Sequence, residues 1–336
     1  MTDATSIPAA HKPRLALYWA SSCGGCEVTV LDISERILDL AARADIVFWP
    51  AVLDVKYEDV HAMPDRHIDV CLFNGAIRTD ENAELARLLR AKSRTLIAFG
   101  SCAVTGGIPS LANNYSRDSI LRASYIDSPT TANPAGVLPQ HRVMVSTDSG
   151  AEVELDLPAF HHSVRTLAQT VPVDYTVPGC PPVADQVWNV LSAVLEGRLP
   201  ARGAVLGASN KSVCEDCLRP RHEKRLQGFV RPHLTKPDPS HCLLDQGIAC
   251  LGPATRGGCG APCTKANMPC RGCYGAMPEV DDQGLKALSA LASLLEAREP
   301  KDVERAIATI PDPLGTFYRF GLAASQLFRT RTQEDA

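Results

Sequence analysis

The sequence predicts an α/β protein, in which a doubly wound parallel sheet is followed by an irregular, cysteine-rich region. Two observations predict this fold class. Short apolar runs alternate with segments of helical periodicity through the first half of the chain, whereas prolines, glycines and cysteines crowd together beyond residue 199. A chain of 336 residues can hold two domains, which we place at residues 1–205 and 206–336.

The predicted sheet depends on five apolar runs that each have about the length of a buried strand. They are residues 14–20, 45–50, 69–75, 94–100 and 171–177. Apolar side chains recur with helical spacing in the intervening or following segments 28–42, 81–89 and 183–195. This alternation of strand and helix indicates parallel strands with helices on both faces of the sheet.

Two stretches depart from the alternating pattern. Residues 113–157 are rich in Pro, Ser, Thr and Asn, which predicts irregular excursions from the sheet. Residues 214–275 carry eight cysteines with few regular elements, and helical periodicity returns only at 283–296. Such a segment cannot offset its chain entropy with a hydrophobic core alone, so we expect bound metal to organise it.

Charge and hydropathy argue against two classes of partner. Lys and Arg total 34 and Asp and Glu total 38, so the net charge is −4 and no basic surface predicts nucleic-acid binding. No apolar run approaches the roughly 20 residues that span a bilayer, and we expect no membrane span. The N-terminal residues resemble neither a secretory nor a twin-arginine signal, so we expect a cytoplasmic protein.

The thirteen cysteines carry most of the functional information. In a reducing compartment so many cysteines indicate metal or redox chemistry rather than disulfides. Cys71 lies within the apolar run DVCLFNG and is expected to be a core residue. The remaining twelve are three times four, which is the number that three all-cysteine cubane clusters require.

The first group comes from loops that follow predicted strands. Its members are Cys23, Cys26, Cys102 and Cys180. Doubly wound sheets assemble their sites at the carboxyl ends of strands, so these four thiols are expected to converge. Neighbouring glycines such as Gly24, Gly25, Gly100, Gly106 and Gly107 would let backbone N–H groups approach the sulfur atoms. Alternatively, Cys102 and Cys180 are ordinary buried cysteines.

The other eight cysteines lie in the second half. They are Cys214, Cys217, Cys242 and Cys250, followed by Cys259, Cys263, Cys270 and Cys273. Pairs with CxxC spacing also occur in structural zinc sites, so a zinc-stabilised interaction protein is an alternative. The irregular spacing of these cysteines and the prolines near them favour loops that bind iron–sulfur clusters over structural zinc sites. His241, next to Cys242, is expected to be a loop histidine rather than a ligand.

Several motifs resemble the small subunits of nickel–iron hydrogenases, in particular the coenzyme-F420-non-reducing (methyl-viologen-reducing) group. The matching stretches are WASSCGGCEVTVLDI, FGSCAVTGGIPSL, VPGCPP, CEDC, CLLDQGIACLGPATRGGCGAPC, PCRGCYG and DPLGTFYRF. They extend from about residue 14 to about residue 320. The resemblance implies a flavodoxin-like first domain and an iron–sulfur second domain. It also implies that this chain is the hydrogenase's electron-transfer subunit and has no nickel–iron site of its own.

The resemblance further implies three four-iron (4Fe–4S) clusters. The proximal group is Cys23, Cys26, Cys102 and Cys180; the medial group is Cys259, Cys263, Cys270 and Cys273; the distal group is Cys214, Cys217, Cys242 and Cys250. Membrane-bound and periplasmic members of the family usually have a histidine where this chain has Cys214, and a non-ligating proline where it has Cys263. A fourth thiolate implies a four-iron medial cluster with a lower potential than a three-iron one.

Two partners are implied by the same resemblance. One is the large subunit, which holds the nickel–iron centre beside the proximal group. The other is an electron-acceptor subunit of iron–sulfur or flavin type, which in the resembled group is linked to heterodisulfide reductase. The first half is also similar to the 20 kDa cluster subunit of complex I, so a cluster subunit of another oxidoreductase is an alternative.

Glu27 follows Cys26, and we expect it to be a helix-dipole partner rather than a proton relay.

Overall fold

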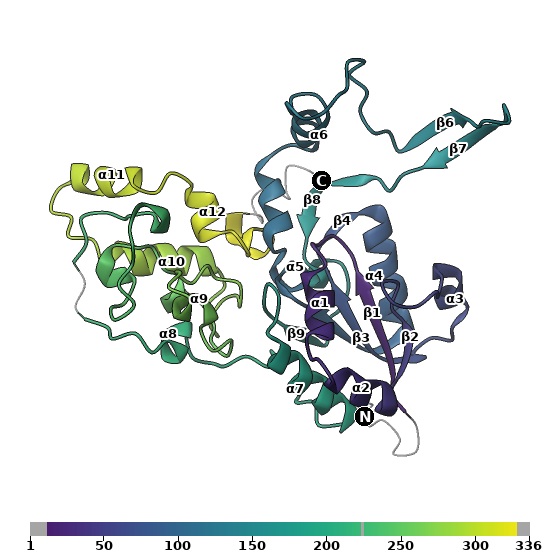
Figure 1. Cartoon of the computed structure of the whole chain (residues 1–336), viewed down its shortest axis with the longest axis horizontal. Coiled ribbons are helices and arrows are strands. Elements are labelled where there is room, and N and C mark those ends of the chain that lie inside the picture. The colour runs from purple at the N-terminus through teal and green to yellow at the C-terminus, as the bar shows by residue number, and fades with distance from the viewer. Residues whose placement is uncertain (1–11, 223–224, 328–336) are drawn as a thin grey trace.

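The computed structural model describes residues 12–222 and 225–327, and its centre is a five-stranded parallel sheet (Figure 1). The strands are β1 (Arg14–Trp19), β2 (Asp45–Phe48), β3 (Ile68–Asn74), β5 (Ser93–Phe99) and β9 (Tyr175–Val177). They lie in the order β2-β1-β3-β5-β9, and every neighbouring pair is parallel. This is the strand order of flavodoxin-like sheets, so the predicted fold class is confirmed.

Helices cover both faces of the sheet. One face carries α1 (Gly25–Leu31), α2 (Arg36–Arg43) and α7 (Ala184–Leu195); the other carries α3 (Tyr57–Ala62), α4 (Asp80–Lys92) and α5 (Ser101–Thr105). The alternation of side chains along β1 explains the two layers. Leu15 and Leu17 pack into the first core, whereas Ala16 and Tyr18 pack into the second. Buried parallel strands therefore read as continuous apolar runs, as the sequence predicted.

The predicted helix over 28–42 is instead two helices. α1 ends at Leu31 and α2 begins at Arg36, and between them Ser34 has a φ of 61°. The break lets Ile33 enter the core completely. By contrast, Val28 and Leu31 are 55% and 52% exposed, although periodicity had placed both on the buried face. Periodicity identifies an apolar stripe but cannot say whether the chain's own core covers it.

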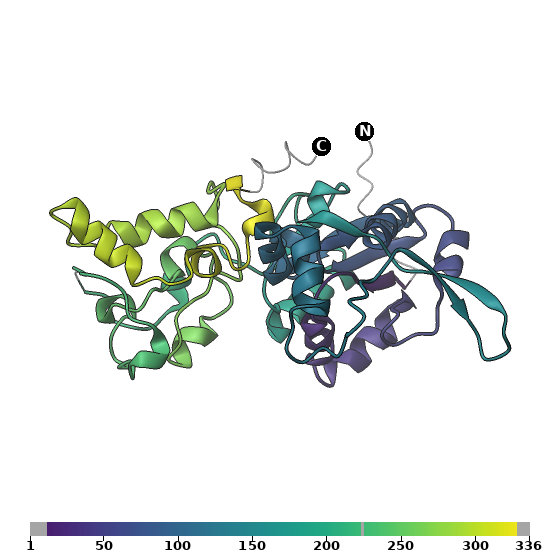
Figure 2. The same ribbon diagram turned by 90° about the horizontal axis from the view of Figure 1, so that it is seen from above.

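The expectation of irregular structure over 113–157 was only partly correct. This stretch contains α6 (Arg117–Tyr125) and a two-stranded ribbon of β6 (Arg142–Ser146) and β7 (Glu152–Asp156). The ribbon projects away from the sheet, as the view from above shows (Figure 2). Its register places Val143 opposite Leu155 and Val145 opposite Val153, so one face is apolar and exposed. A second small pair, β4 (Ile77–Thr79) and β8 (Phe160–Arg165), returns the chain to the sheet.

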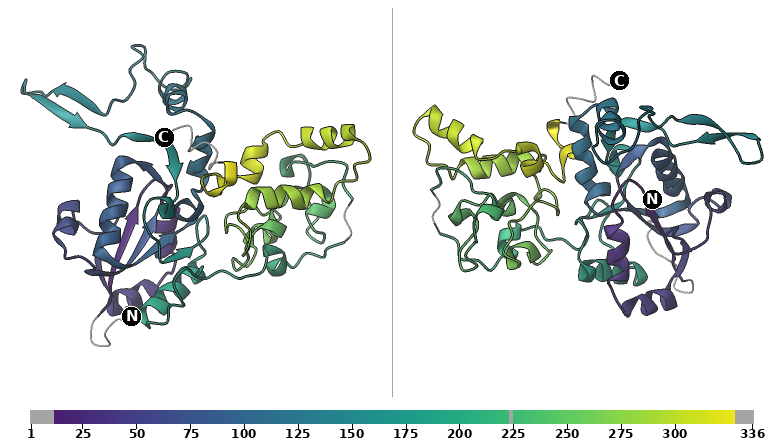
Figure 3. Two further views of the ribbon diagram at one scale, coloured as in Figure 1. Left: turned by 180° about the vertical axis from the view of Figure 1, so that it is seen from behind. Right: turned by 45° about the horizontal axis from the view of Figure 1, so that its top comes forward.

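The cysteine-rich region lies beside the sheet and is built from short helices joined by long loops (Figure 3). The helices are α8 (Val213–Asp216), α9 (Pro262–Lys265), α10 (Gln283–Ala292), α11 (Pro300–Ala308) and α12 (Pro313–Phe317). A separate hydrophobic cluster that includes Leu243, Leu251, Leu291 and Phe317 holds them together, with several cysteines packed against it. Within residues 12–222 and 225–327, no helix combines the length and the apolar character needed to cross a bilayer.

Candidate metal-binding sites

The four cysteines of the proximal group lie in loops at the carboxyl edge of the sheet. Cys23 and Cys26 follow β1, Cys102 follows β5, and Cys180 follows β9. Burial raises the pKa of the Cys26 thiol far above its ordinary value, and the thiols of Cys102, Cys180 and Cys23 raise it further. These four thiols therefore lie within one another's electrostatic field, as the loop positions predicted.

Glycines at this edge make room for the sulfur atoms. Gly100 has a φ of +83°, and a Cβ there would lie 2.3 Å from the Sγ of Cys26. Gly107 has a φ of +56°, and its Cβ would lie 2.6 Å from the Sγ of Cys102. Glycine is required at both positions for two reasons: the backbone has a positive φ, and a cysteine Sγ lies where a Cβ would be.

Replacing Gly100 by alanine is therefore expected to disturb the proximal group without removing a ligand. Gly203→Ala is the matched control, because its φ is +89° and no atom lies within 4 Å of the added Cβ. Each variant should lose about 1–2 kcal/mol of stability from the left-handed backbone. Only Gly100→Ala should also lose iron, measured per chain after anaerobic purification. Equal iron contents in the two variants would contradict the role given to Gly100.

The four cysteines of the distal group line one small cavity in the cysteine-rich region. Cys214 lies in α8 and Cys217 directly follows it, while Cys242 and Cys250 come from later loops. Burial raises the pKa of Cys214, and Cys242 raises it further. Arg219 and Arg221 also line this cavity and bring positive charge to the thiols. The structure thus brings the four predicted side chains to one place.

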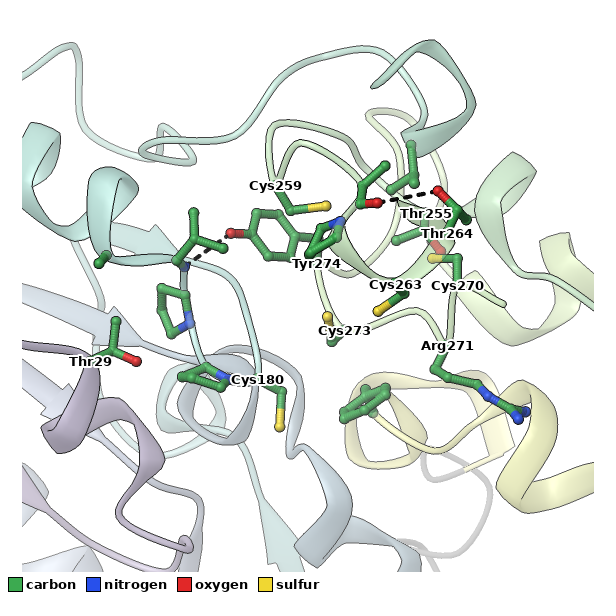
Figure 4. Close-up of a pocket in the computed structure, with 18 of the residues that line it drawn as sticks. Thr29, Cys180, Thr255, Cys259, Cys263, Thr264, Cys270, Arg271, Cys273 and Tyr274 are labelled. Carbon is green, nitrogen blue, oxygen red and sulfur yellow. Dashed lines mark hydrogen bonds between the residues drawn. The ribbon is translucent and has the colours of Figure 1, made fainter. Parts of the chain in front are cut away.

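The four cysteines of the medial group line a larger cavity of about 490 Å³, which lies between the sheet and the cysteine-rich region (Figure 4). Cys180 of the proximal group lines the same cavity. Tyr274, next to Cys273, crosses between the two parts of the chain, because its hydroxyl accepts from the N–H of Val183 at 3.4 Å and donates to Gln186 at 2.5 Å. The medial cysteines are therefore positioned by contacts with the sheet as well as by their own loop.

Hydrogen bonds connect the three groups in a row. The Ser101 hydroxyl, next to Cys102, donates to the carbonyl oxygen of Cys273 at 2.5 Å and joins the proximal and medial loops. The backbone N–H of Cys270 donates to the Sγ of Cys250 at 3.2 Å and joins the medial and distal loops. The medial group therefore lies between the other two. Sequence spacing did not identify Ser101, Tyr274 or Gln186 as contacts that hold this arrangement.

The donor sets fit iron–sulfur clusters. Burial raises the pKa of Cys102, Cys250, Cys270 and Cys273 to about 12, and neighbouring thiols add to the effect. Four thiolates at one site require cations to offset their mutual repulsion, which a cluster's iron provides. The described part of the chain has no group of three or more His, Cys, Asp or Glu side chains that could hold one metal ion. A cluster spreads its ligands more widely than a single ion does.

Three other residues that the sequence singled out have local partners. Cys71 is fully buried in β3 and belongs to a hydrophobic core. The Nδ1 of His241 lies 3.0 Å from the Oδ2 of Asp238 at the exposed end of its loop. Glu27 lies in the first turn of α1 but is only 6% exposed, and its carboxylate accepts a hydrogen bond from the Trp49 indole. Burial raises the pKa of Glu27, against the effect of that hydrogen bond.

Comparisons with known proteins identify the family. Residues 23–194 match the family of NADH ubiquinone oxidoreductase, 20 Kd subunit, so the predicted similarity of the first half to that subunit is confirmed. The iron-sulfur subunit of the F420-non-reducing hydrogenase of Archaeoglobus profundus is 41% identical over 320 residues, which are 94% of this chain and 97% of the relative. The corresponding F420-non-reducing hydrogenase subunit of Methanothermobacter marburgensis is 36% identical over 94% of this chain and 96% of the relative.

A solved structure agrees with these relatives at the level of the fold. The nickel–iron–selenium hydrogenase of Dm. baculatum aligns with 80% of this chain and 97% of its own, with a TM-score of 0.50 and 20% identity. The 20 Kd family covers only the first half, whereas the hydrogenase relatives extend through the cysteine-rich half as well. The chain therefore belongs to the family of nickel–iron hydrogenase small subunits.

Proposed function

We propose that this chain carries electrons from hydrogen oxidation, which takes place in a separate large subunit, to a low-potential acceptor. The observation that supports this function most is the row of three cysteine groups, which runs from the sheet edge through the medial cavity to the distal cavity. Bound iron–sulfur clusters would supply one-electron chemistry at each group. The residues of this chain hold the groups in a row and bury several of their thiols, among them Cys26, Cys102, Cys250 and Cys270.

The proposed ligands are the twelve cysteines outside the core. Cys23, Cys26, Cys102 and Cys180 hold the proximal four-iron cluster, Cys259, Cys263, Cys270 and Cys273 the medial one, and Cys214, Cys217, Cys242 and Cys250 the distal one. Two observations support this assignment. The medial cysteines line one cavity and the distal cysteines another, and the other proximal thiols raise the pKa of Cys26. We also propose that the chain divides into two domains near residue 205, since the core of the sheet extends to Leu206 and the separate core of the cysteine-rich region begins at Val213.

The large subunit is proposed to cover the edge that carries the proximal group. The relatives that this chain matches are themselves subunits of hydrogenases, which supports a partner subunit here. Trp19 at the end of β1, Val28 in α1 and Ile108 after α5 flank the loops that carry the proximal cysteines and are 46%, 55% and 50% exposed, so large apolar side chains stay uncovered beside these loops. The density of thiols further supports a reducing compartment, and we propose the cytoplasm.

Copurification with the large subunit tests the proposed function. The anaerobically isolated complex is expected to reduce methyl viologen with hydrogen as the electron donor. The family of the 20 Kd subunit favours a second candidate, a cluster subunit of another oxidoreductase. A partner that lacks paired CxxC nickel ligands near both ends, together with no hydrogen-dependent dye reduction, would favour that second candidate and contradict the hydrogenase function.

A further inference from the structure

Three arginines line a cleft beside the loops that carry the medial and distal cysteines. The cleft has a volume of about 110 Å³ and is formed by the loop at Phe229–Pro232, the medial loop and the segment that leads into α12. Arg231 comes from the first of these segments and Arg271 from the second, whereas Arg319 lies just beyond the end of α12. Arg271 extends from the medial loop toward the C-terminal segment, as Figure 4 shows. Ala249, which also lines the cleft, directly precedes the distal cysteine Cys250.

Among the described side chains that line the cleft, three arginines face a single acid. Within the described ranges, the side chains of Arg231 and Arg271 have neither a hydrogen bond nor an ion pair, and Arg319 uses only its Nε, which donates to the Gly315 carbonyl at 2.9 Å. Asp312 is the one acid among the described lining residues, and its Oδ1 already accepts from the N–H of Gly315 at 2.8 Å. The cleft therefore has a formal charge of 3 − 1 = +2.

The guanidinium groups also repel one another. All three line the same small cleft, so their charges lie close together. Arginine stays charged in proteins, so an anion from outside the chain would relieve the repulsion. The planar guanidinium fork matches a carboxylate in two parallel hydrogen bonds. A carboxylate fits the cleft's volume, whereas sites for drug-sized ligands or cofactors have volumes of about 300–1,000 Å³.

We propose that this cleft binds a carboxylate on the surface of an acidic protein that accepts the electrons. The inference depends on the proposed function and deepens it by naming the chemistry of the acceptor. The location supports it, because a protein seated over Arg271 and Ala249 lies beside medial and distal ligands at once. None of the proximal cysteines lines the cleft, so we place the acceptor away from the edge that the large subunit is proposed to cover.

The test uses the anaerobic two-subunit complex with hydrogen as donor and two acceptors, an acidic bacterial-type ferredoxin and the dication methyl viologen. Arg231→Gln and Arg319→Gln are combined, and Arg271 is left in place because it lies between two proposed ligands. The control combines Arg122→Gln and Arg142→Gln, two arginines that are 66% exposed on the other part of the chain. Rates are measured from about 0.01 M to about 0.15 M salt, where the Debye length falls from about 30 Å to about 8 Å.

We expect the second-order rate constant for ferredoxin to fall about tenfold in the Arg231/Arg319 variant at low salt, with a weaker salt dependence, because electrostatic steering is lost. Viologen reduction and the control variant's ferredoxin rate should be unchanged. Ferredoxin rates that match the control would overturn the inference. An equal fall with viologen would also overturn it, since the arginines would then act on the clusters and not on docking. A wild-type complex that reduces neither acceptor would instead contradict the proposed function itself.

Discussion

Replacement of Cys102 by alanine is expected to abolish the proximal cluster and nearly all hydrogen-dependent electron transfer. Cys102 is 7% exposed and lies in the field of Cys180 and Cys23, so its loss leaves three thiolates around the site. Iron should fall from about twelve to about eight atoms per chain. Viologen reduction by the two-subunit complex should fall by about 100-fold or more, because loss of residues that only orient a ligand already costs up to about 100-fold.

Cys71→Ala is the matched control for this variant. Both cysteines are buried in the sheet domain, Cys71 within β3 and Cys102 in α5 just after β5, and burial raises the pKa of each to about 12. Cys71, however, packs only into the hydrophobic core. Its replacement should cost about 1 kcal/mol of stability and leave all the iron in place. Loss of a cluster from Cys71→Ala, or full iron and activity in Cys102→Ala, would show that the assignment of Cys102 as a ligand and Cys71 as a core residue is wrong.

Cys263→Pro is expected to convert the medial cluster to a three-iron form with a higher reduction potential. Cys263 lies in the first turn of α9 and is exposed to solvent. Proline is tolerated in the first turn of a helix because its missing N–H has no partner there. Removing one thiolate changes both the cluster type and the charge of the ligand set, and both determine the potential. Electron paramagnetic resonance with redox titration measures the change.

Cys263→Ala separates the loss of the thiolate from any effect of the proline ring. If the thiolate is the ligand, both variants should show the same new spectrum, with the proximal and distal signals unchanged. A spectrum that stays as in the wild type in either variant would remove Cys263 from the ligand set. A change only in Cys263→Pro would point to a distorted loop.

Most of the sheet could be predicted because buried parallel strands have a strong sequence signal. Four of the five apolar runs lie at the observed strands within a few residues, and the fifth was predicted too long, since β9 contains only Tyr175–Val177. The ribbon of β6 and β7 was missed. Its alternation of apolar and polar residues is short and flanked by prolines and serines, and the chain's own core covers neither face.

The meeting of the four proximal thiols could be predicted and the resemblance implied the order proximal, medial, distal, whereas the contacts that hold the three groups in place could not be predicted. CxxC spacing and loop position bring Cys23 and Cys26 together, and the doubly wound topology adds Cys102 and Cys180. The hydrogen bonds that hold the cysteine groups next to one another are long-range and have no local sequence signal. Ser101 and Tyr274 reach residues that are 172 and 88–91 positions away, and such pairs follow from tertiary structure rather than from local pattern.

The exposed apolar residues of α1 show a further limit of sequence reasoning. Val28 and Leu31 lie on the same helix as the buried Val30, and the periodic pattern could not distinguish a side chain that packs in the core from one that the core of this chain leaves exposed. The same is true of the arginine cleft. No motif marks Arg231, Arg271 and Arg319, because three loops that are distant in the sequence bring them together.

Iron and acid-labile sulfide analysis of the anaerobically purified chain, with zinc measured in the same sample, tests the central claim most directly. Twelve thiolates in three groups predict about twelve iron atoms and about twelve sulfide ions per folded chain, with almost no zinc. A folded, colourless chain that contains zinc in place of iron, or no metal at all, would contradict the account.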